Sequence, residues 1–310
     1  MATYFLDENK VHYMWDKTLK PALKIDPGDR VIIELRDVTD GQITPNSTTE
    51  DLNKLDWNRM YPLAGPIYIR GAEPGDTLTV RIIDVKTKGW GWSAILPGYG
   101  LLEEFDKPYL KIWDLSEGDY TILDDKAIIP IKPFCGTMGV APKEEGKHPV
   151  MPPGNFGGNM DIKHLTRGSI LKLPVFVEGA LFSCGDGHAA QGDGEVCVTA
   201  IEAPLYVVLE FDIEKKTNLK RPQAIIFKEP YEEYETFYMT MGISSNLMEA
   251  AKIAVRDMID LICDKYRLKR EDAYILASLT CDLKISEIVD KPNWIVTAHM
   301  PIDIFIEELE

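Results

Sequence analysis

Short turns rich in proline, glycine and aspartate repeatedly precede runs of β-branched residues in this chain. Residues 26–29 come before the apolar run 31–35, and residues 73–76 come before 78–85. Within the second run apolar and polar residues partly alternate, so one face of each strand is expected in a core and the other in a wetter environment. Strands joined by tight turns pair antiparallel. The pattern predicts a mainly β protein whose antiparallel sheets form a sandwich or a barrel-like structure.

The pattern changes after residue 240. Asn246 and Glu249 fit a capping box, and apolar residues follow at helical spacing as far as Ile262. A second helix is predicted over about 271–281, and a further strand over 294–300. We therefore expect a β-rich body over residues 1–235, which carries the active-site loops, and a C-terminal α+β module over 240–310. The two parts are expected to pack together, either as a body with a separate module or as one integrated domain. The fold class is α+β overall.

Composition excludes several classes of partner. The net charge is −16, and this opposes binding to nucleic acids or to an anionic membrane surface, which both select basic proteins. No apolar run of about 18 residues is present, and the first residues lack the basic and apolar regions of a signal peptide. The five cysteines are an odd number without a CxxC pair, which favours a reducing compartment. These features predict a cytoplasmic protein.

The segment 185–195 concentrates site chemistry. It holds one histidine, three carboxylates and four glycines, and the apolar runs 171–182 and 196–201 that flank it are predicted strands. Asp186 and His188 are two apart, so in an extended chain their side chains point to the same side. Such a pair suits a cation or a proton relay. The alternative is a solvated hairpin tip, because glycine and aspartate are ordinary turn residues.

Several blocks of sequence carry a resemblance to a known family. Residues 174–183, followed by 185–196 and 199–202, resemble the signature of the acetamidase/formamidase family. Residues 65–76, 139–142 and 152–161 look like further segments of that family, in the same order. The resemblance runs nearly end to end. It implies an amidohydrolase that converts a small neutral amide such as formamide or acetamide into the carboxylate and ammonia.

Amide hydrolysis needs a nucleophile, a group that stabilises the oxyanion and an acid for the leaving nitrogen. In a metal route, aspartate and histidine ligands hold a divalent ion, with zinc as our expectation. The candidate ligands are Asp161, Asp186 and His188, with Asp37 as a fourth. Glu195 is the candidate proton shuttle. Asp186 and His188 therefore count as catalytic candidates together with Glu195.

A covalent route is the alternative mechanism. Cys184 lies two residues before Asp186 and four before His188, so its thiol is the obvious nucleophile. Buried cysteines are also common in strands, which gives Cys184 an ordinary structural explanation. The chain has no Gly-x-Ser-x-Gly elbow, and this disfavours a serine triad of the α/β-hydrolase kind.

Substrate recognition is predicted in the glycine- and asparagine-rich segment before Asp161. Asn155, Gly158 and Asn159 offer amide donors and acceptors that suit a small carboxamide. The alternative is a tight connection between strands. Asp193 could help to bind a structural Ca²⁺, although the spacing of an EF-hand is not met.

The segment 86–108 carries an unusual apolar load for a loop. We expect it to be covered, either as the interface of a homodimer or higher homo-oligomer or as a lid over the active site. A different class of function also stays open, namely a non-catalytic, metal-containing β-rich protein that binds a small ligand. Ammonia release from formamide or acetamide separates the enzyme from this binding protein.

Overall fold

The computed structural model describes residues 1–102, 104–123, 127–227, 235–268 and 270–305. Its largest sheet has nine strands, and all neighbours pair antiparallel except the first two, which are parallel. Their order across the sheet is β1 (Thr3–Leu6), β4 (Arg30–Glu34), β15 (Leu205–Glu214), β6 (Thr77–Thr87), β13 (Ile170–Pro174), β16 (Gln223–Phe227), β17 (Thr236–Ser244), β19 (Trp294–Pro301) and β18 (Asp282–Glu287).

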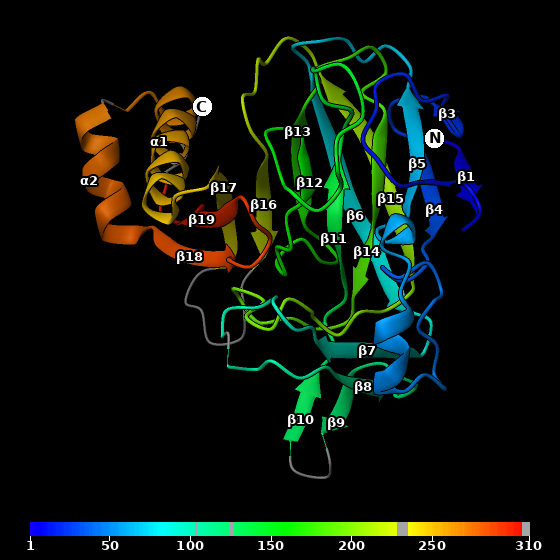
Figure 1. Ribbon diagram of the computed structural model, residues 1–310. Coiled ribbons are helices and arrows are strands. Elements are labelled where there is room, and N and C mark those ends of the chain that lie inside the picture. Colours follow the sequence, from blue (N-terminus) through cyan, green and yellow to red (C-terminus); the bar gives the residue numbers. More distant parts are fainter. Residues whose placement is uncertain (103, 124–126, 228–234, 269, 306–310) are drawn as a thin grey trace.

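A second, six-stranded sheet faces part of the first (Figure 1). Its order is β12 (Gly157–Asn159), β11 (Phe134–Gly139), β14 (Phe182–His188), β5 (Leu63–Ile69) and β2 (Val11–His12), with β3 (Leu23–Ile25) parallel to β5. Two hairpins and two short 3₁₀ helices lie outside these two sheets. They are β7 (Trp90–Ile95) with β8 (Tyr109–Asp114), β9 (Tyr120–Leu123) with β10 (Ala127–Pro130), η1 (Thr49–Lys54) and η2 (Trp57–Arg59).

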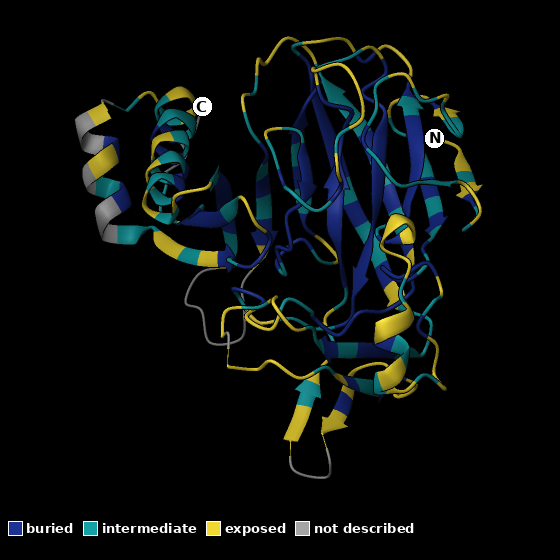
Figure 2. Ribbon diagram, in the orientation of Figure 1, coloured by how far each residue is buried: buried dark blue, intermediate teal, exposed yellow. Residues whose placement is uncertain are grey.

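The main core lies between the two sheets. One continuous apolar cluster takes residues from both, and the rings of Phe182 on β14 and Phe211 on β15 meet edge to face at 5.1 Å. Figure 2 shows that the strands of both sheets are largely buried, whereas the β9–β10 hairpin is mostly exposed. The predicted mainly β fold with packed antiparallel sheets is confirmed.

The C-terminal part adds two helices, α1 (Leu247–Tyr266) and α2 (Arg270–Thr280), beside β17 and β19. The Asn246 side chain accepts a hydrogen bond from the Glu249 amide at 3.0 Å and caps α1 as expected. At Gly242 on β17 the helix backbone leaves no room for a Cβ, so this glycine permits the close approach. β17 to β19 continue the nine-stranded sheet, and the division into body and module stays a prediction.

Three local expectations are wrong. Residues 196–201 form no strand, because Glu195 and Val198 have left-handed φ values of 45° and 70° that turn the backbone. Gly185–His188 belong to strand β14 rather than to a loop. The segment 86–108, which we expected to be a loop, contains the strand β7. Within the described residues, no helix combines the length and the apolar character that a membrane crossing needs.

Candidate active site

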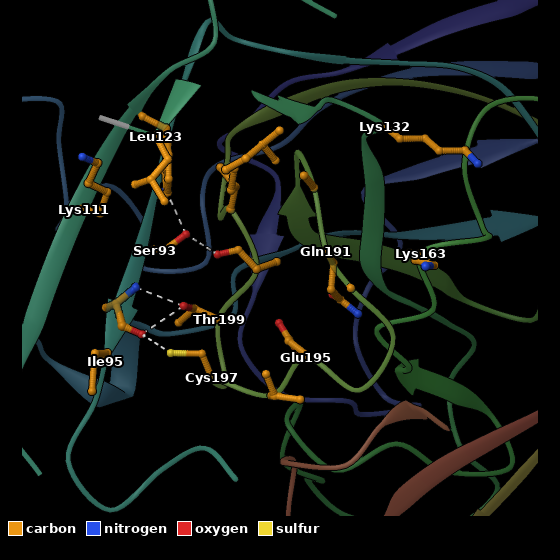
Figure 3. A pocket seen from close by; sticks show the side chains of 18 of the residues that line it. Ser93, Ile95, Lys111, Leu123, Lys132, Lys163, Gln191, Glu195, Cys197 and Thr199 are labelled. Atoms are coloured by element: carbon orange, nitrogen blue, oxygen red, sulfur yellow. Dashed lines mark hydrogen bonds between the residues drawn. The ribbon is translucent and has the colours of Figure 1, made fainter. Parts of the chain in front are cut away.

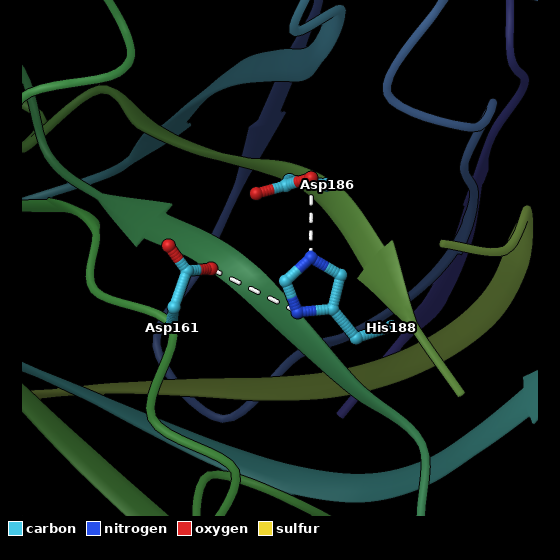
Figure 4. A group of neighbouring side chains, drawn as sticks. All are labelled: Asp161, Asp186 and His188. Atoms are coloured by element: carbon cyan, nitrogen blue, oxygen red, sulfur yellow. Dashed lines mark ion pairs between the residues drawn. The ribbon is translucent and has the colours of Figure 1, made fainter. Parts of the chain in front are cut away.

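Strand β14 carries the first two site residues. All seven of its residues are buried. The side chains of Asp186 and His188 lie close together, in keeping with their spacing, although Asp186 itself departs from the regular pleat with a left-handed φ of 55°. His188 Nε2 lies 3.3 Å from Asp186 Oδ1, and His188 Nδ1 lies 3.8 Å from Asp161 Oδ1. Figure 4 shows the imidazole ring between the two carboxylates. The structure thus brings together three of the predicted metal ligands.

The neighbouring strand β11 leaves space for this cluster. A Cβ at Gly136 would lie 2.7 Å from His188 Cε1 and 2.8 Å from Asp186 Oδ2. Any larger residue would therefore push these side chains apart. Asp161, Asp186 and Glu195 also have left-handed φ values of 46°, 55° and 45°. Such conformations cost about 1–3 kcal/mol each in a non-glycine residue and are typical of functional sites.

Three further carboxylates complete the cluster: Glu195, Glu202 and Asp290. Glu202 Oε2 lies 3.2 Å from His188 Nε2. The predicted ligands Asp161, Asp186 and His188 form one group whose potential ligand atoms all lie within 4.8 Å of one another. Two further groups meet the same distance: His188 with Glu195 and Glu202, and Asp161 with Glu195 and Asp290. One imidazole and five carboxylates therefore share one buried space.

Different elements hold these later residues. Glu202 lies in an isolated bridge to Trp92 on β7, with backbone hydrogen bonds of 2.7 and 2.8 Å in both directions. Asp290 lies between β18 and β19, in the C-terminal part of the nine-stranded sheet. The Gly194 amide donates to the Ser286 carbonyl at 3.0 Å, which ties the Glu195 turn to the end of β18.

Hydrogen bonds connect the two sides of the cluster. Thr137 Oγ1 on β11 donates to Asn159 Oδ1 at 2.5 Å and lies 3.4 Å from Asp186 Oδ2. The Asn159 amide group in turn donates to Asp290 Oδ2. The backbone amide of Asp290 donates to Glu287 Oε1 at 2.5 Å. Asp290 is therefore oriented both by Asn159 of the six-stranded sheet and by Glu287 within its own turn.

Burial and crowding shift the titration of these groups strongly. Burial, and then the charges of neighbouring carboxylates, raise the pKa of Asp161 well above its ordinary range, and burial does the same for Glu195. Burial raises the pKa of Glu202 to about 7 and that of Asp290 to about 6. For His188, burial alone would lower the pKa, but the charges of Glu202 and Asp186 outweigh it and raise the pKa well above 6.5.

Several polar atoms of the cluster have no hydrogen-bond partner among the described residues. Asp161 Oδ1 and His188 Nδ1 are two such atoms, both buried, whereas Glu202 Oε2 contacts His188 Nε2. Buried polar atoms are normally paired, because an unpaired one costs free energy. Together with the excess of carboxylates over bases, these atoms fit a divalent cation with nitrogen and oxygen ligands.

The cluster lines a small chamber with a volume of about 30 Å³. Asn159, Thr199 and several apolar and aromatic side chains form the rest of its wall, including Trp92, which is almost fully buried. A volume of this size holds about two water-sized probes. It suits a ligand of a few heavy atoms and excludes bulk water from the carboxylates.

The remaining predicted residues lie at different places. Both carboxylate oxygens of Asp37 accept hydrogen bonds within its own turn, from Thr39 and from the Gly41 amide at 2.8 Å, and Asp37 is in none of the three groups. Asn159 lines the chamber, whereas Asn155 is exposed and Gly158 pairs with β11.

Sequence reasoning missed Glu202 and Asp290. Glu202 stands at the end of the block 199–202, which carried part of the family resemblance, so that block was the available signal. For Asp290 the sequence offers no comparable signal, because it lies between two strands of the C-terminal part. Only the pairing of β17 to β19 with the large sheet brings it to the chamber.

Comparison with known proteins agrees with this architecture. The family described as "Acetamidase/Formamidase family" matches residues 3–148 and 143–307. A formamidase of Methylophilus methylotrophus is 30% identical, with 96% of this chain and 90% of that protein covered. An acetamidase of Mycolicibacterium smegmatis is 32% identical, with 66% of each chain covered.

Solved structures give the same result. A predicted acetamidase/formamidase from Thermoanaerobacter tengcongensis superposes with a TM-score of 0.89 at 35% identity and covers 98% of this chain and 97% of its own. An acetamidase from Bacillus halodurans has a TM-score of 0.88 at 32% identity, with 96% and 97% covered. The sequence match, the superposition and the arrangement of the sheets lead to one conclusion: the chain belongs to the acetamidase/formamidase family.

Proposed function

We propose that this protein is an amidase that hydrolyses short aliphatic amides such as formamide and acetamide to the carboxylate and ammonia. The observation that carries the proposal is the chamber of about 30 Å³, in which one imidazole and five carboxylates converge. The formamidase and acetamidase relatives support the same substrate class. A small neutral amide is also indifferent to the net charge of −16.

We further propose that Asp161, Asp186 and His188 hold a divalent metal, with zinc as the first choice. Their atoms lie within 4.8 Å of one another, and Asp161 Oδ1 and His188 Nδ1 have no other partner among the described residues. The chemistry that zinc supplies in such sites is polarisation of a carbonyl and acidification of water. A structural calcium ion near Asp193 is a separate, secondary proposal, and there Lys163 competes with it through an ion pair of 3.1 Å.

Glu195 is our candidate for proton transfer. Its carboxylate lies in two groups of close potential ligand atoms, one with His188 and Glu202 and the other with Asp161 and Asp290. Burial raises its pKa well above 4.5, which brings proton uptake and release closer to neutral pH, where a general acid–base works best. We propose that Glu195 accepts the proton of the attacking water and delivers it to the departing nitrogen. Glu202 holds His188 in place through its contact at Nε2.

The asparagine-rich segment contributes less to substrate contact than its composition suggests. Asn159 is the member that lines the chamber, and its amide is engaged with Thr137 and Asp290. We propose that Asn159 mainly orients Asp290. Substrate binding by Asn155 and Gly158 would need a rearrangement of the segment that carries them.

The thiol route has less support. Cys184 is fully buried within the main apolar core cluster and does not line the chamber. A nucleophile must reach the carbonyl carbon, so this position disfavours direct attack. We expect Cys184→Ala to keep its activity.

We also propose a cytoplasmic homodimer or larger homo-oligomer. The five cysteines are free thiols in the structure, in keeping with a reducing compartment. Large apolar side chains are exposed on the segment after β7 and on the β9–β10 hairpin, among them Leu101, Leu102, Phe105 and Ile128. Burial of such a patch stabilises subunit contacts. Light scattering that gives the mass of a single 35.0 kDa chain would refute the oligomer.

The test of function is ammonia release by the purified protein. We expect formamide and acetamide to release ammonia, chelation to abolish the release, and added Zn²⁺ to restore it while elemental analysis follows the bound metal. Binding of amides with no ammonia release would instead support a non-catalytic metal-containing binding protein. Ammonia release that survives complete loss of metal would overturn the metal proposal and leave the amidase.

A further inference from the structure

Two aromatic side chains lie at the mouth of the chamber. Trp57 and Tyr99 both line it, and their rings stack at a centroid distance of 5.6 Å with an interplanar angle of 10°. Trp57 is 47% exposed and Tyr99 is 41% exposed. Every other described residue that lines the chamber is buried or only partly exposed. The stack therefore stands between the carboxylate cluster and the solvent.

The two rings come from separate segments, each of which is fixed near its base. Trp57 begins η2, and Arg59 at the end of η2 forms an ion pair with the buried Asp40 at 2.8 Å. Tyr99 lies in a turn closed by its amide on the Leu96 carbonyl at 3.0 Å. The next hydrogen bond, from the Leu101 amide to the Val196 carbonyl at 2.9 Å, joins this turn to the segment that carries Glu195.

We propose that the Trp57–Tyr99 stack sets the size limit of the substrate, so that the enzyme accepts primary amides with acyl groups of one or two carbons and rejects longer or aromatic ones. This deepens the proposed amidase function and rests on it. The chamber behind the stack has a volume of about 30 Å³. With the amide group at the cluster, a propyl or phenyl substituent would extend into the space that the two rings occupy.

The test compares substrates of different length in variants of the two rings. Trp57→Ala and Tyr99→Ala open the mouth, and we measure kcat/KM for formamide, acetamide, butyramide and benzamide. The ratio of butyramide to formamide should rise by about 10-fold or more, because a single methylene in an apolar pocket changes discrimination by roughly 10- to 200-fold. A loss of general stability would lower all four values together and leave this ratio unchanged.

Matched variants control for side effects. Phe105→Ala removes an aromatic ring that is 53% exposed on the same connecting segment, outside the chamber lining, and should leave the ratio at the wild-type value. Tyr99→Phe keeps the ring and should also keep the ratio. If the alanine variants do not fold by circular dichroism, Trp57→Leu and Tyr99→Leu retain apolar volume but remove the flat stack, and the same rise is expected.

The possible results separate this inference from the proposed function. Wild-type protein that releases ammonia from none of the four amides would refute the amidase function. Wild-type protein that already hydrolyses butyramide and formamide with equal kcat/KM would overturn the size limit alone. An unchanged ratio in folded variants of both rings would also overturn it, while the amidase function would stand.

Discussion

Two cavities of this protein share a wall and differ in almost everything else. The larger one, about 650 Å³, lies between the β7–β8 hairpin and residues 190–201, and it is lined mainly by apolar side chains such as Trp113 and Ile129. Figure 3 shows Lys111 on one side of it and Lys132 and Lys163 on the other. The smaller chamber, about 30 Å³, holds the carboxylate cluster. Two residues, Glu195 and Thr199, line both.

The larger cavity and the cluster of potential catalytic groups therefore lie at different places in the molecule. A cavity of several hundred Å³ is the usual first candidate for a ligand site. Yet the groups of potential metal ligands found among the described residues all lie around the small chamber. There, exclusion of water makes each charge matter, as the raised pKa values of Glu202 and Asp290 show. We therefore propose the small chamber as the site of the reaction.

Removal of the central imidazole should have the largest effect. His188→Ala deletes an imidazole that lies within 4 Å of the carboxylates of Asp161, Asp186 and Glu202. Bound metal and kcat/KM should fall together, the latter by roughly 10³-fold or more, since metal assistance contributes several kcal/mol to such reactions. Elemental analysis and ammonia release measure the two quantities. His148→Ala, outside the cluster, is the control, and a fully metallated His188 variant would remove the assignment.

Neutralising Glu195, which lines both cavities, should have the next largest effect. Glu195→Gln preserves shape but removes the basic carboxylate, so kcat should fall by about 10²-fold, the scale of general acid–base catalysis. The metal content should stay at the wild-type level. Steady-state rates and elemental analysis of the same preparation test this. An active Glu195→Gln enzyme would show that Glu195 is merely part of the wall.

The turn that carries Asp290 should matter less, but measurably. The Glu287 carboxylate is fully buried and accepts hydrogen bonds from the amides of Val289 and Asp290. Glu287→Ala frees this turn, and we expect kcat/KM to fall by about 10- to 100-fold, as for residues that orient site groups. Glu287→Gln retains the accepting oxygen and should recover most of the activity. Equal losses in the two variants would mean that the charge, rather than the hydrogen bonds, is required.

Filling the large cavity should have the smallest effect. Gly192 lines it, a Cβ at this position would meet no atom within 4 Å, and its φ is not left-handed. Gly192→Leu should therefore fold normally and change kcat/KM for formamide by less than about threefold, because the reaction does not use this volume. Initial rates with formamide suffice for the measurement. A loss as large as that of Glu195→Gln would assign the large cavity to the reaction.

Much of the fold could be predicted because it depends on local patterns. The turn–strand repeats predicted antiparallel sheets, and the cap at Asn246 predicted the start of α1. The prediction of a strand over 196–201 was wrong because composition does not reveal the left-handed residues Glu195 and Val198. Propensity describes what a segment favours, and tertiary contacts override it where a site needs a turn.

The candidate site divides in the same way. The two-residue spacing by itself predicted that the side chains of Asp186 and His188 point to the same side, because the period of an extended backbone is a local property. Only the structure showed that both residues belong to strand β14. The sequence also placed Glu195 close behind them. Only the tertiary structure added Glu202 and Asp290, since sheet pairing and packing bring together residues that are far apart in the chain. The small volume of the chamber arises in the same way, from side chains of many elements packed together, and no single segment encodes it.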